Sequence, residues 1–235
     1  PNRFEFDFPV KFKLPLSGEV DLSKTVLGLC GGMCFAALDH FYSGEPLPQA
    51  DRQEQIDPDT LTYLCERQLD SLSIPVVLKI IEWMLIDRAE IARRMARVEI
   101  PKLRRLLDRG EPAVLALIRV QGAADPTRNH QVVATAYDFD DQTHDLVLTL
   151  YDPNHPASAP TLRLNLSNPR TGFDLIQSTG EPLRGFFVIP YRRPARRAIF
   201  APRAVLAPRG PLPFRLQWPV DSHRVNQFFG ENPDS

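Results

Sequence analysis

Three segments of the chain carry side chains whose types and spacing could support acyl-transfer chemistry. Cys30 stands directly before Gly31 and Gly32, and His130 and Asp152 follow much later in the chain, in that order. A thiol attacks an acyl carbon as its thiolate, and a helix N-terminus stabilises that negative charge. An imidazole can take the proton and return it, while a carboxylate holds the far ring nitrogen. The order of these residues therefore predicts a thiol nucleophile, a proton shuttle and an orienting group.

The elements around these residues are predicted to bring them together. The apolar residues after the glycine pair recur at the helical spacing i, i+3, i+4 and i+7; they are Cys34, Ala37, Leu38 and Phe41. Gly44 is a natural end for this helix. Backbone N–H groups at its start, near Cys30 and Gly31, would bind an oxyanion. His130 begins an apolar strand and Asp152 follows the next one, so both are expected to face the helix start.

Hydrophobic patterns along the chain predict helices before strands. Helices are expected at 59–69, with Asp59 as the N-cap, and at 75–86, 88–97 and 101–108. Strands are expected at 113–120, 130–137, 146–151, 161–166 and 185–190, after an extended arm over residues 1–27. This order predicts an α+β fold in which an N-terminal helical half packs on an antiparallel β-sheet.

The motifs around the three candidate residues resemble those of a known superfamily. The stretch Cys30–Leu38 resembles the helix-opening cysteine motif of papain-like peptidases, most closely the branch that cleaves double-glycine leader peptides from bacteriocins. Asn129–Asp138 resembles the family's strand that begins with the catalytic histidine, and Leu148–Pro153 resembles the following strand, which ends in Asp-Pro. The resemblance implies a papain-like fold and a cysteine peptidase, or another thiol acyl hydrolase, acting on a peptide or acyl substrate through a Cys-His-Asp triad.

Two departures from the family pattern leave alternatives open. The family usually places a glutamine about six residues before its cysteine as an oxyanion donor, and loss of such a donor typically lowers the rate about 10²–10³-fold. That position holds Lys24 here, or Gly28 if Cys34 is the nucleophile. A Cys-Gly-x-Cys-aromatic form of the motif would select Cys34. We prefer Cys30, because it lies at the turn, whereas Cys34 lies on the core-facing stripe. Lys24 and Asn154 are secondary site candidates.

The last part of the chain has a different character. Residues 1–190 are expected to form the papain-like domain, and the proline- and arginine-rich residues 191–215 a linker or surface arm. Residues 216–233 resemble the opening strand and turn of lysostaphin-type cell-wall endopeptidases, so residues 216–235 are expected to begin a truncated C-terminal module of a multidomain bacterial protein. This resemblance implies access to the bacterial cell wall through a following domain. It also keeps a second hypothesis open, a catalytically inactive papain-fold module that docks a peptide or a cell-wall strand.

The composition limits the partners that the chain is expected to have. A net charge of -1 provides no global field for nucleic acid, and no apolar run reaches the roughly 20 residues that span a bilayer. Three cysteines are too few for a disulfide framework and favour a reducing compartment. Localisation, cytoplasmic or exported, and oligomeric state are left open. No cofactor or metal is expected, although His130, Asp152 and His155 form an alternative ligand set of loose, turn-borne spacing.

Overall fold

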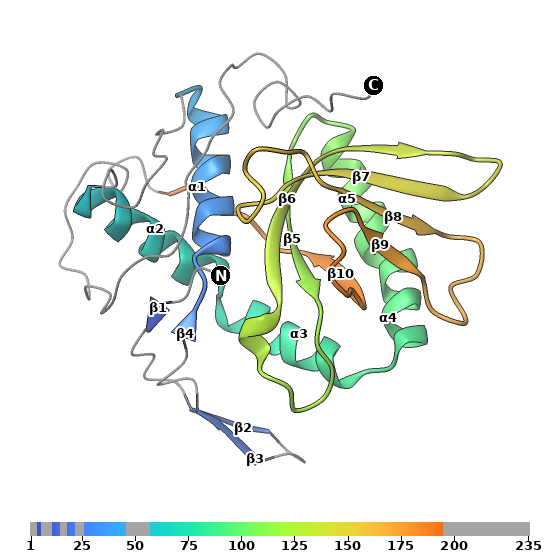
Figure 1. The fold of residues 1–235 in the computed structure, drawn as a ribbon, viewed down its shortest axis with the longest axis horizontal. Coiled ribbons are helices and arrows are strands. Elements are labelled where there is room, and N and C mark those ends of the chain that lie inside the picture. The colour runs from blue at the N-terminus through green and yellow to red at the C-terminus, as the bar shows by residue number, and fades with distance from the viewer. Residues whose placement is uncertain (1–3, 6–10, 15–17, 22–25, 46–56, 195–235) are drawn as a thin grey trace.

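The computed structural model describes residues 4–5, 11–14, 18–21, 26–45 and 57–194, in which helices precede the main sheet along the chain (Figure 1). The helices are α1 (Cys30–Ser43), α2 (Pro58–Ser71), α3 (Ile74–Leu85), α4 (Arg88–Arg94) and α5 (Ile100–Leu107). A π-helical turn, η2 (Met95–Glu99), joins α4 to α5. The predicted helix after the glycine pair is confirmed, and Gly44 ends it in the left-handed conformation at a φ of 70°.

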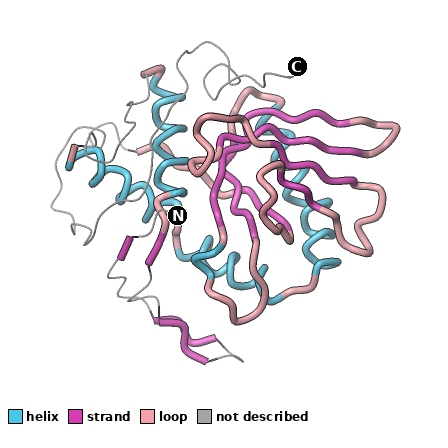
Figure 2. The backbone as a smooth tube through the Cα atoms, viewed as in Figure 1, coloured by secondary structure: helices cyan, strands magenta, loops and turns pink. Residues whose placement is uncertain are grey.

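The main sheet has six strands, all paired antiparallel. They are β5 (Ala113–Ile118), β6 (His130–Phe139), β7 (Asp145–Tyr151), β8 (Thr161–Asn165), β9 (Leu175–Gln177) and β10 (Gly185–Val188), arranged in the order β10-β5-β6-β7-β8-β9. The five predicted strands are confirmed, whereas β9 is too short to give a period-two pattern in the sequence. The sheet curls into a half-barrel (Figure 2). A register shift between Ala134 and Ala136 lies in the long strand β6, and such bulges bend a strand and increase its twist.

The helices flank the sheet in two groups, which the tube view separates clearly (Figure 2). Helix α1 packs on both α2 and strand β6, while α3, α5 and the α4–η2 segment pack on β5, β6 and β10. The core between them is apolar, and Trp83, Phe186 and Phe187 are fully buried in it. The α+β class, with a helical half packed on an antiparallel sheet, is therefore confirmed.

Four short strands precede α1: β1 (Phe4–Glu5), β2 (Lys11–Leu14), β3 (Gly18–Asp21) and β4 (Val26–Leu27). They pair antiparallel as β1 with β4 and β2 with β3. Several predictions concern residues outside those that the structure describes. These are Lys24, residues 195–215 of the expected linker, and the expected C-terminal module at 216–235.

The N-cap of helix α2 lies two residues before the predicted one, Asp59. The N-cap is Asp57, whose Oδ1 accepts a hydrogen bond from the Thr60 backbone N–H at 2.8 Å and whose Oδ2 accepts one from the Thr60 hydroxyl at 2.6 Å. Pro58 occupies the first helical position, where its missing N–H costs nothing. The prediction was wrong because either aspartate can cap a helix and only the proline distinguishes the two starts.

The residues from Arg88 to Leu107 form one unbroken helical run rather than two helices. Pro101 lies inside this run and cannot donate a backbone hydrogen bond, and its ring crowds the carbonyl one turn earlier. The π-helical turn η2 lies directly before it and widens the backbone there. Among the described residues, no helix combines the length and apolar character needed to cross a bilayer.

Candidate active site

The first turn of α1 contains two glycines because helix α2 lies against it. A Cβ atom at Gly32 would lie 2.2 Å from the carbonyl oxygen of Leu64, and one at Gly31 would lie 2.2 Å from the hydroxyl oxygen of Ser71. The Gly32 N–H donates a hydrogen bond of 2.7 Å to Oε1 of buried Gln68 on α2. The glycine pair therefore allows α2 to approach and hold the helix start that carries the thiol.

The three cysteines differ in their accessibility. Cys30 is the first residue of α1 and is only partly buried, whereas Cys34 is 0% exposed and faces the core. Burial, with smaller contributions from Cys30 and Asp152, raises the pKa of Cys34 well above its ordinary value. Burial and the nearby Glu66 raise the pKa of Cys65 to about 11. Both buried thiols are therefore held in the neutral form, and Cys30 differs from them in position and in environment.

A short turn fixes His130 at the beginning of β6. The side chain of Asn129 accepts a hydrogen bond from the Arg119 backbone N–H at 2.9 Å and donates one to the Pro126 carbonyl at 3.0 Å. These bonds tie the end of β5 to the start of β6, where His130 pairs with Leu117. The imidazole is 5% exposed, so its protonation is controlled by neighbouring groups rather than by bulk water.

Antiparallel pairing of β6 with β7 brings Asp152 beside His130. The last residue of β7, Tyr151, pairs with Val133, so the residue after it reaches the beginning of β6. Oδ1 of Asp152 lies 2.7 Å from Nε2 of His130 and accepts a hydrogen bond from the Asn154 backbone N–H at 2.9 Å. Asp152 is 0% exposed. The Asp-Pro-Asn turn therefore both ends the strand and fixes the carboxylate against the imidazole.

The charges of the three residues shift one another's pKa values. Burial alone would raise the pKa of Cys30, but the positive charge and hydrogen bond of His130, with a backbone hydrogen bond from Gln131, lower it. Burial alone would lower the pKa of His130, but the charges of Asp152 and Cys30 and hydrogen bonds to both raise it to about 9. The pKa of Asp152 is lowered, since His130 outweighs the effect of burial. The site therefore stabilises a thiolate beside an imidazolium.

The sequence did not identify the three buried glutamines around this site. Gln68 binds the Gly32 N–H, and Gln131 lies 4% exposed directly after His130, with its side chain against Gly31. On β9, Gln177 places its Nε2 3.5 Å from Oδ2 of Asp152. Gln68 could have been found from the sequence, because a glutamine on the buried face of an amphipathic helix is a detectable signal. Gln177 lies on the strand that the sequence did not predict.

Of the remaining predicted site residues, Asn154 and Gly31 are described by the structure and lie in the same region. Nδ2 of Asn154 is 3.5 Å from Nε2 of His130. The Gly32 N–H is bound to Gln68, so the N–H groups of Cys30 and Gly31 are the first-turn donors left for an oxyanion. The alternative metal set is not assembled: His155 Nε2 lies 3.6 Å from Glu181 Oε1, and within the described ranges no group of three ligating side chains is placed to hold a metal ion.

Replacing Asp152 by asparagine tests the electrostatic coupling in this site. Asp152→Asn keeps the size of the side chain but removes the negative charge that raises the pKa of His130 to about 9. We expect the pKa of His130 to fall below about 9, because the effect of burial is then opposed by the Cys30 thiolate alone. Titration of the His130 ring by NMR measures this directly. Asn154→Ala is the matched control and should leave the pKa of His130 near 9; an unchanged pKa in Asp152→Asn would contradict the assignment.

Taken together, the fold and the geometry define a thiol–imidazole–carboxylate site at the junction of a helix start and an antiparallel sheet. Comparisons with protein-family models, with curated proteins and with solved structures found no match to this chain.

Proposed function

We propose that this chain is a papain-like, cysteine-dependent peptidase or other thiol acyl hydrolase. One observation carries the proposal: a partly exposed thiol at a helix start neighbours an imidazole whose Nε2 lies 2.7 Å from a buried carboxylate. The opposite pKa shifts of Cys30 and His130 support it, because an ion pair of this kind supplies a thiolate near neutral pH. The resemblance of the cysteine, histidine and Asp-Pro segments to double-glycine leader peptidases agrees with the same assignment.

The proposed reaction proceeds in two steps. The Cys30 thiolate adds to the carbonyl carbon of the substrate, and the N–H groups of Cys30 and Gly31 bind the oxyanion. His130 donates its proton to the leaving group as the bond to that group breaks, which leaves an acyl-thioester. His130 then takes a proton from water, the hydroxide attacks the thioester, and the thiolate is released. Asp152 holds Nε2 throughout, so Nδ1 is the ring nitrogen that faces the thiol and the leaving group.

The nucleophile is tested by asking which cysteine reacts first. Native protein is treated with iodoacetamide at a series of pH values, and the modified cysteine is identified by mass spectrometry. We expect Cys30 to react fastest, with a rate that rises well below pH 8.5, the free-thiol value, and that does not fall near pH 9, because the thiolate remains when the imidazolium deprotonates. Cys30→Ser should remove the fast phase and Cys34→Ser should keep it.

The opposite outcome would favour the second hypothesis. If all three cysteines react slowly with an ordinary pH profile, the chain has kept the arrangement without the reactive thiolate. The domain would then be better described as an inactive module that docks a peptide or a cell-wall strand, and binding rather than turnover would be the property to measure.

A further inference from the structure

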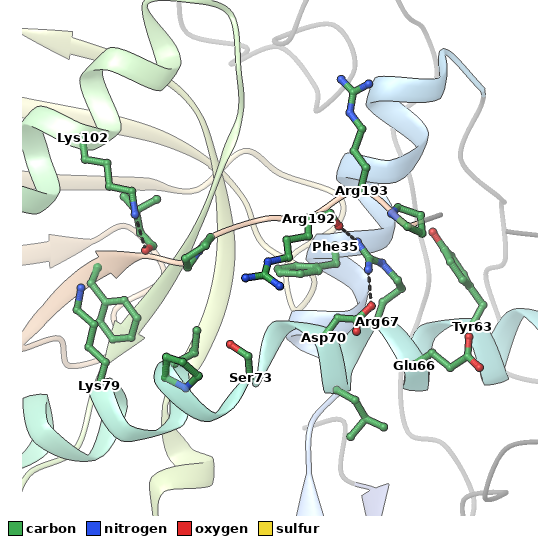
Figure 3. Close-up of a pocket in the computed structure, with 17 residues that line it drawn as sticks. Phe35, Tyr63, Glu66, Arg67, Asp70, Ser73, Lys79, Lys102, Arg192 and Arg193 are labelled. Carbon is green, nitrogen blue, oxygen red and sulfur yellow. Dashed lines mark hydrogen bonds and ion pairs between the residues drawn. The ribbon is translucent and has the colours of Figure 1, made fainter. Parts of the chain in front are cut away.

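A groove separate from the thiol site runs between helices α2 and α3 and the chain that leaves the sheet after β10. Its volume is about 1130 Å³, and neither Cys30, His130 nor Asp152 lines it. In Figure 3, Lys79 and Lys102 lie at one end of the groove and Tyr63 and Glu66 at the other. A groove of this size exceeds the usual range for a small-molecule site and accommodates a short peptide segment.

The lining is strongly cationic although the whole chain carries a net charge of -1. Its basic side chains are Arg67, Lys79, Lys102, Arg192 and Arg193, and its acidic side chains are Glu66 and Asp70. Some of these charges are already neutralised within the fold. Arg67 binds Asp70 at 2.5 Å, and Lys79 binds Glu99 at 2.5 Å. The charges available to a ligand are therefore mainly those of the remaining basic residues.

Among the described residues, three basic side chains of the groove form no ion pair: Lys102, Arg192 and Arg193. Arg193 lies over the Tyr42 ring, 4.2 Å from its centroid, so the other two remain for a ligand. Within the described part of the chain, no carboxylate lies within ion-pair distance of Lys102 or Arg192. Lys102 donates only to the Val188 carbonyl, at 3.3 Å. Burial, together with the charge of Lys79, lowers the pKa of Lys102, although Glu99 opposes this effect. Arg192 is exposed and turns towards the middle of the groove (Figure 3). Both side chains would gain from an anionic ligand.

The backbone of the groove wall is not free to pair with a ligand strand. β10 is an edge strand, but the Val188 N–H donates to Oε2 of Glu99 at 2.9 Å, and its carbonyl is bound by Lys102. Beyond the strand, Pro190 has no N–H, and the Arg192 carbonyl accepts a hydrogen bond of 2.8 Å from Arg67. Strand addition is therefore hindered at these positions, which favours recognition by side chains in this groove.

We propose that this groove binds an acidic peptide segment, whose carboxylates contact Lys102 and Arg192 and whose apolar side chains pack on the groove wall. The apolar part of the lining supports a peptide over a simple anion. Leu69 is 41% exposed at the rim, and Pro75 and Pro190 are exposed beside it. The groove proposal does not depend on the thiol chemistry, because the two sites share no residue.

The test measures binding of a fluorescein-labelled peptide of alternating Glu and Leu to the full chain by fluorescence anisotropy. Reversal of the two cations assigned to the peptide carboxylates, Lys102→Glu with Arg192→Glu, should weaken binding at least about tenfold. The matched control is Arg163→Glu with Arg170→Glu, two exposed arginines outside the groove, which makes the same change in net charge. It should alter affinity by less than about twofold. Arg192→Glu alone, at an exposed position, keeps the test valid if the double variant is unstable.

Three further outcomes decide the proposal. The same peptide with Gln in place of Glu should bind much more weakly, and equal binding would overturn the role of charge. Displacement of the peptide by tripolyphosphate, with no effect of replacing Leu by Ser, would overturn the peptide assignment in favour of a general anion site. Cys30→Ser should bind as tightly as the native chain, so a failure of the groove and a failure of the thiol site are distinguishable.

Discussion

Replacing His130 by alanine should slow alkylation of Cys30 about 10- to 100-fold near pH 7. The imidazolium is the main group that lowers the pKa of this thiol against the effect of burial. Without it, burial and the Asp152 charge both act to raise the pKa, so the thiolate fraction at neutral pH falls to a few per cent or less. A less acidic thiol gives a more nucleophilic thiolate, which offsets part of this loss. The measurement is the second-order rate constant for iodoacetamide as a function of pH.

The control for this variant is another histidine close to the site. His155 lies three residues after Asp152, and its Nε2 lies 3.6 Å from Oε1 of Glu181. His155→Ala should change the alkylation rate by less than about threefold, because its charge reaches Cys30 only weakly through solvent. If His130→Ala and His155→Ala slow alkylation equally, or neither slows it, the thiolate–imidazolium pair does not exist in solution.

Replacing Gly32 by alanine should destabilise the fold by about 3 kcal/mol, at the upper end of the range for overpacked sites. The added methyl group would lie 2.2 Å from the Leu64 carbonyl oxygen, which belongs to the backbone of α2 and cannot rotate away. The two helices must separate, which weakens the 2.7 Å hydrogen bond from Gly32 to Gln68. The free energy of unfolding in urea reports the change. The alkylation rate of Cys30 should also exceed that of the other two cysteines by less than in the native chain, because its helix start has moved.

Gly44 provides the comparison for this helix. A Cβ atom at Gly44 meets nothing within 4 Å, so only its φ of 70° penalises a side chain there. Gly44→Ala should therefore cost about 1 kcal/mol, the usual penalty for a left-handed conformation. Equal effects at the two glycines would show that α2 does not press on the first turn of α1, and the account of the glycine pair would fail.

The features that were predictable from the sequence are those with a local pattern. The helix after Cys30 has its stripe and its terminal glycine, and His130 and Asp152 stand at the ends of two neighbouring strands. Antiparallel pairing of those strands then brings the imidazole and the carboxylate together without further information. The preference for Cys30 over Cys34 followed from the same stripe, and the structure places Cys34 in the core.

The features that were missed depend on contacts between distant parts of the chain. Gln177 reaches Asp152 from a three-residue strand, and the groove joins Arg67 on α2 to Arg192 beyond β10. Neither Gln177 nor Arg192 stands in a local sequence pattern that distinguishes it from a surface residue. The N-cap of α2 was missed for a different reason, because two aspartates with equal capping ability lie two residues apart and only Pro58 at the first helical position distinguishes them.

The capped edge of β10 also affects how copies of this protein behave towards one another. An edge strand with free N–H and carbonyl groups can pair with the same strand of a second molecule, and such pairing starts aggregation. Here the Val188 N–H donates to Glu99 and the Val188 carbonyl accepts from Lys102. Two residues further on, Pro190 has no backbone N–H to donate. Two side chains from the α4–η2–α5 run therefore make the end of this edge strand a poor template for self-association at high concentration.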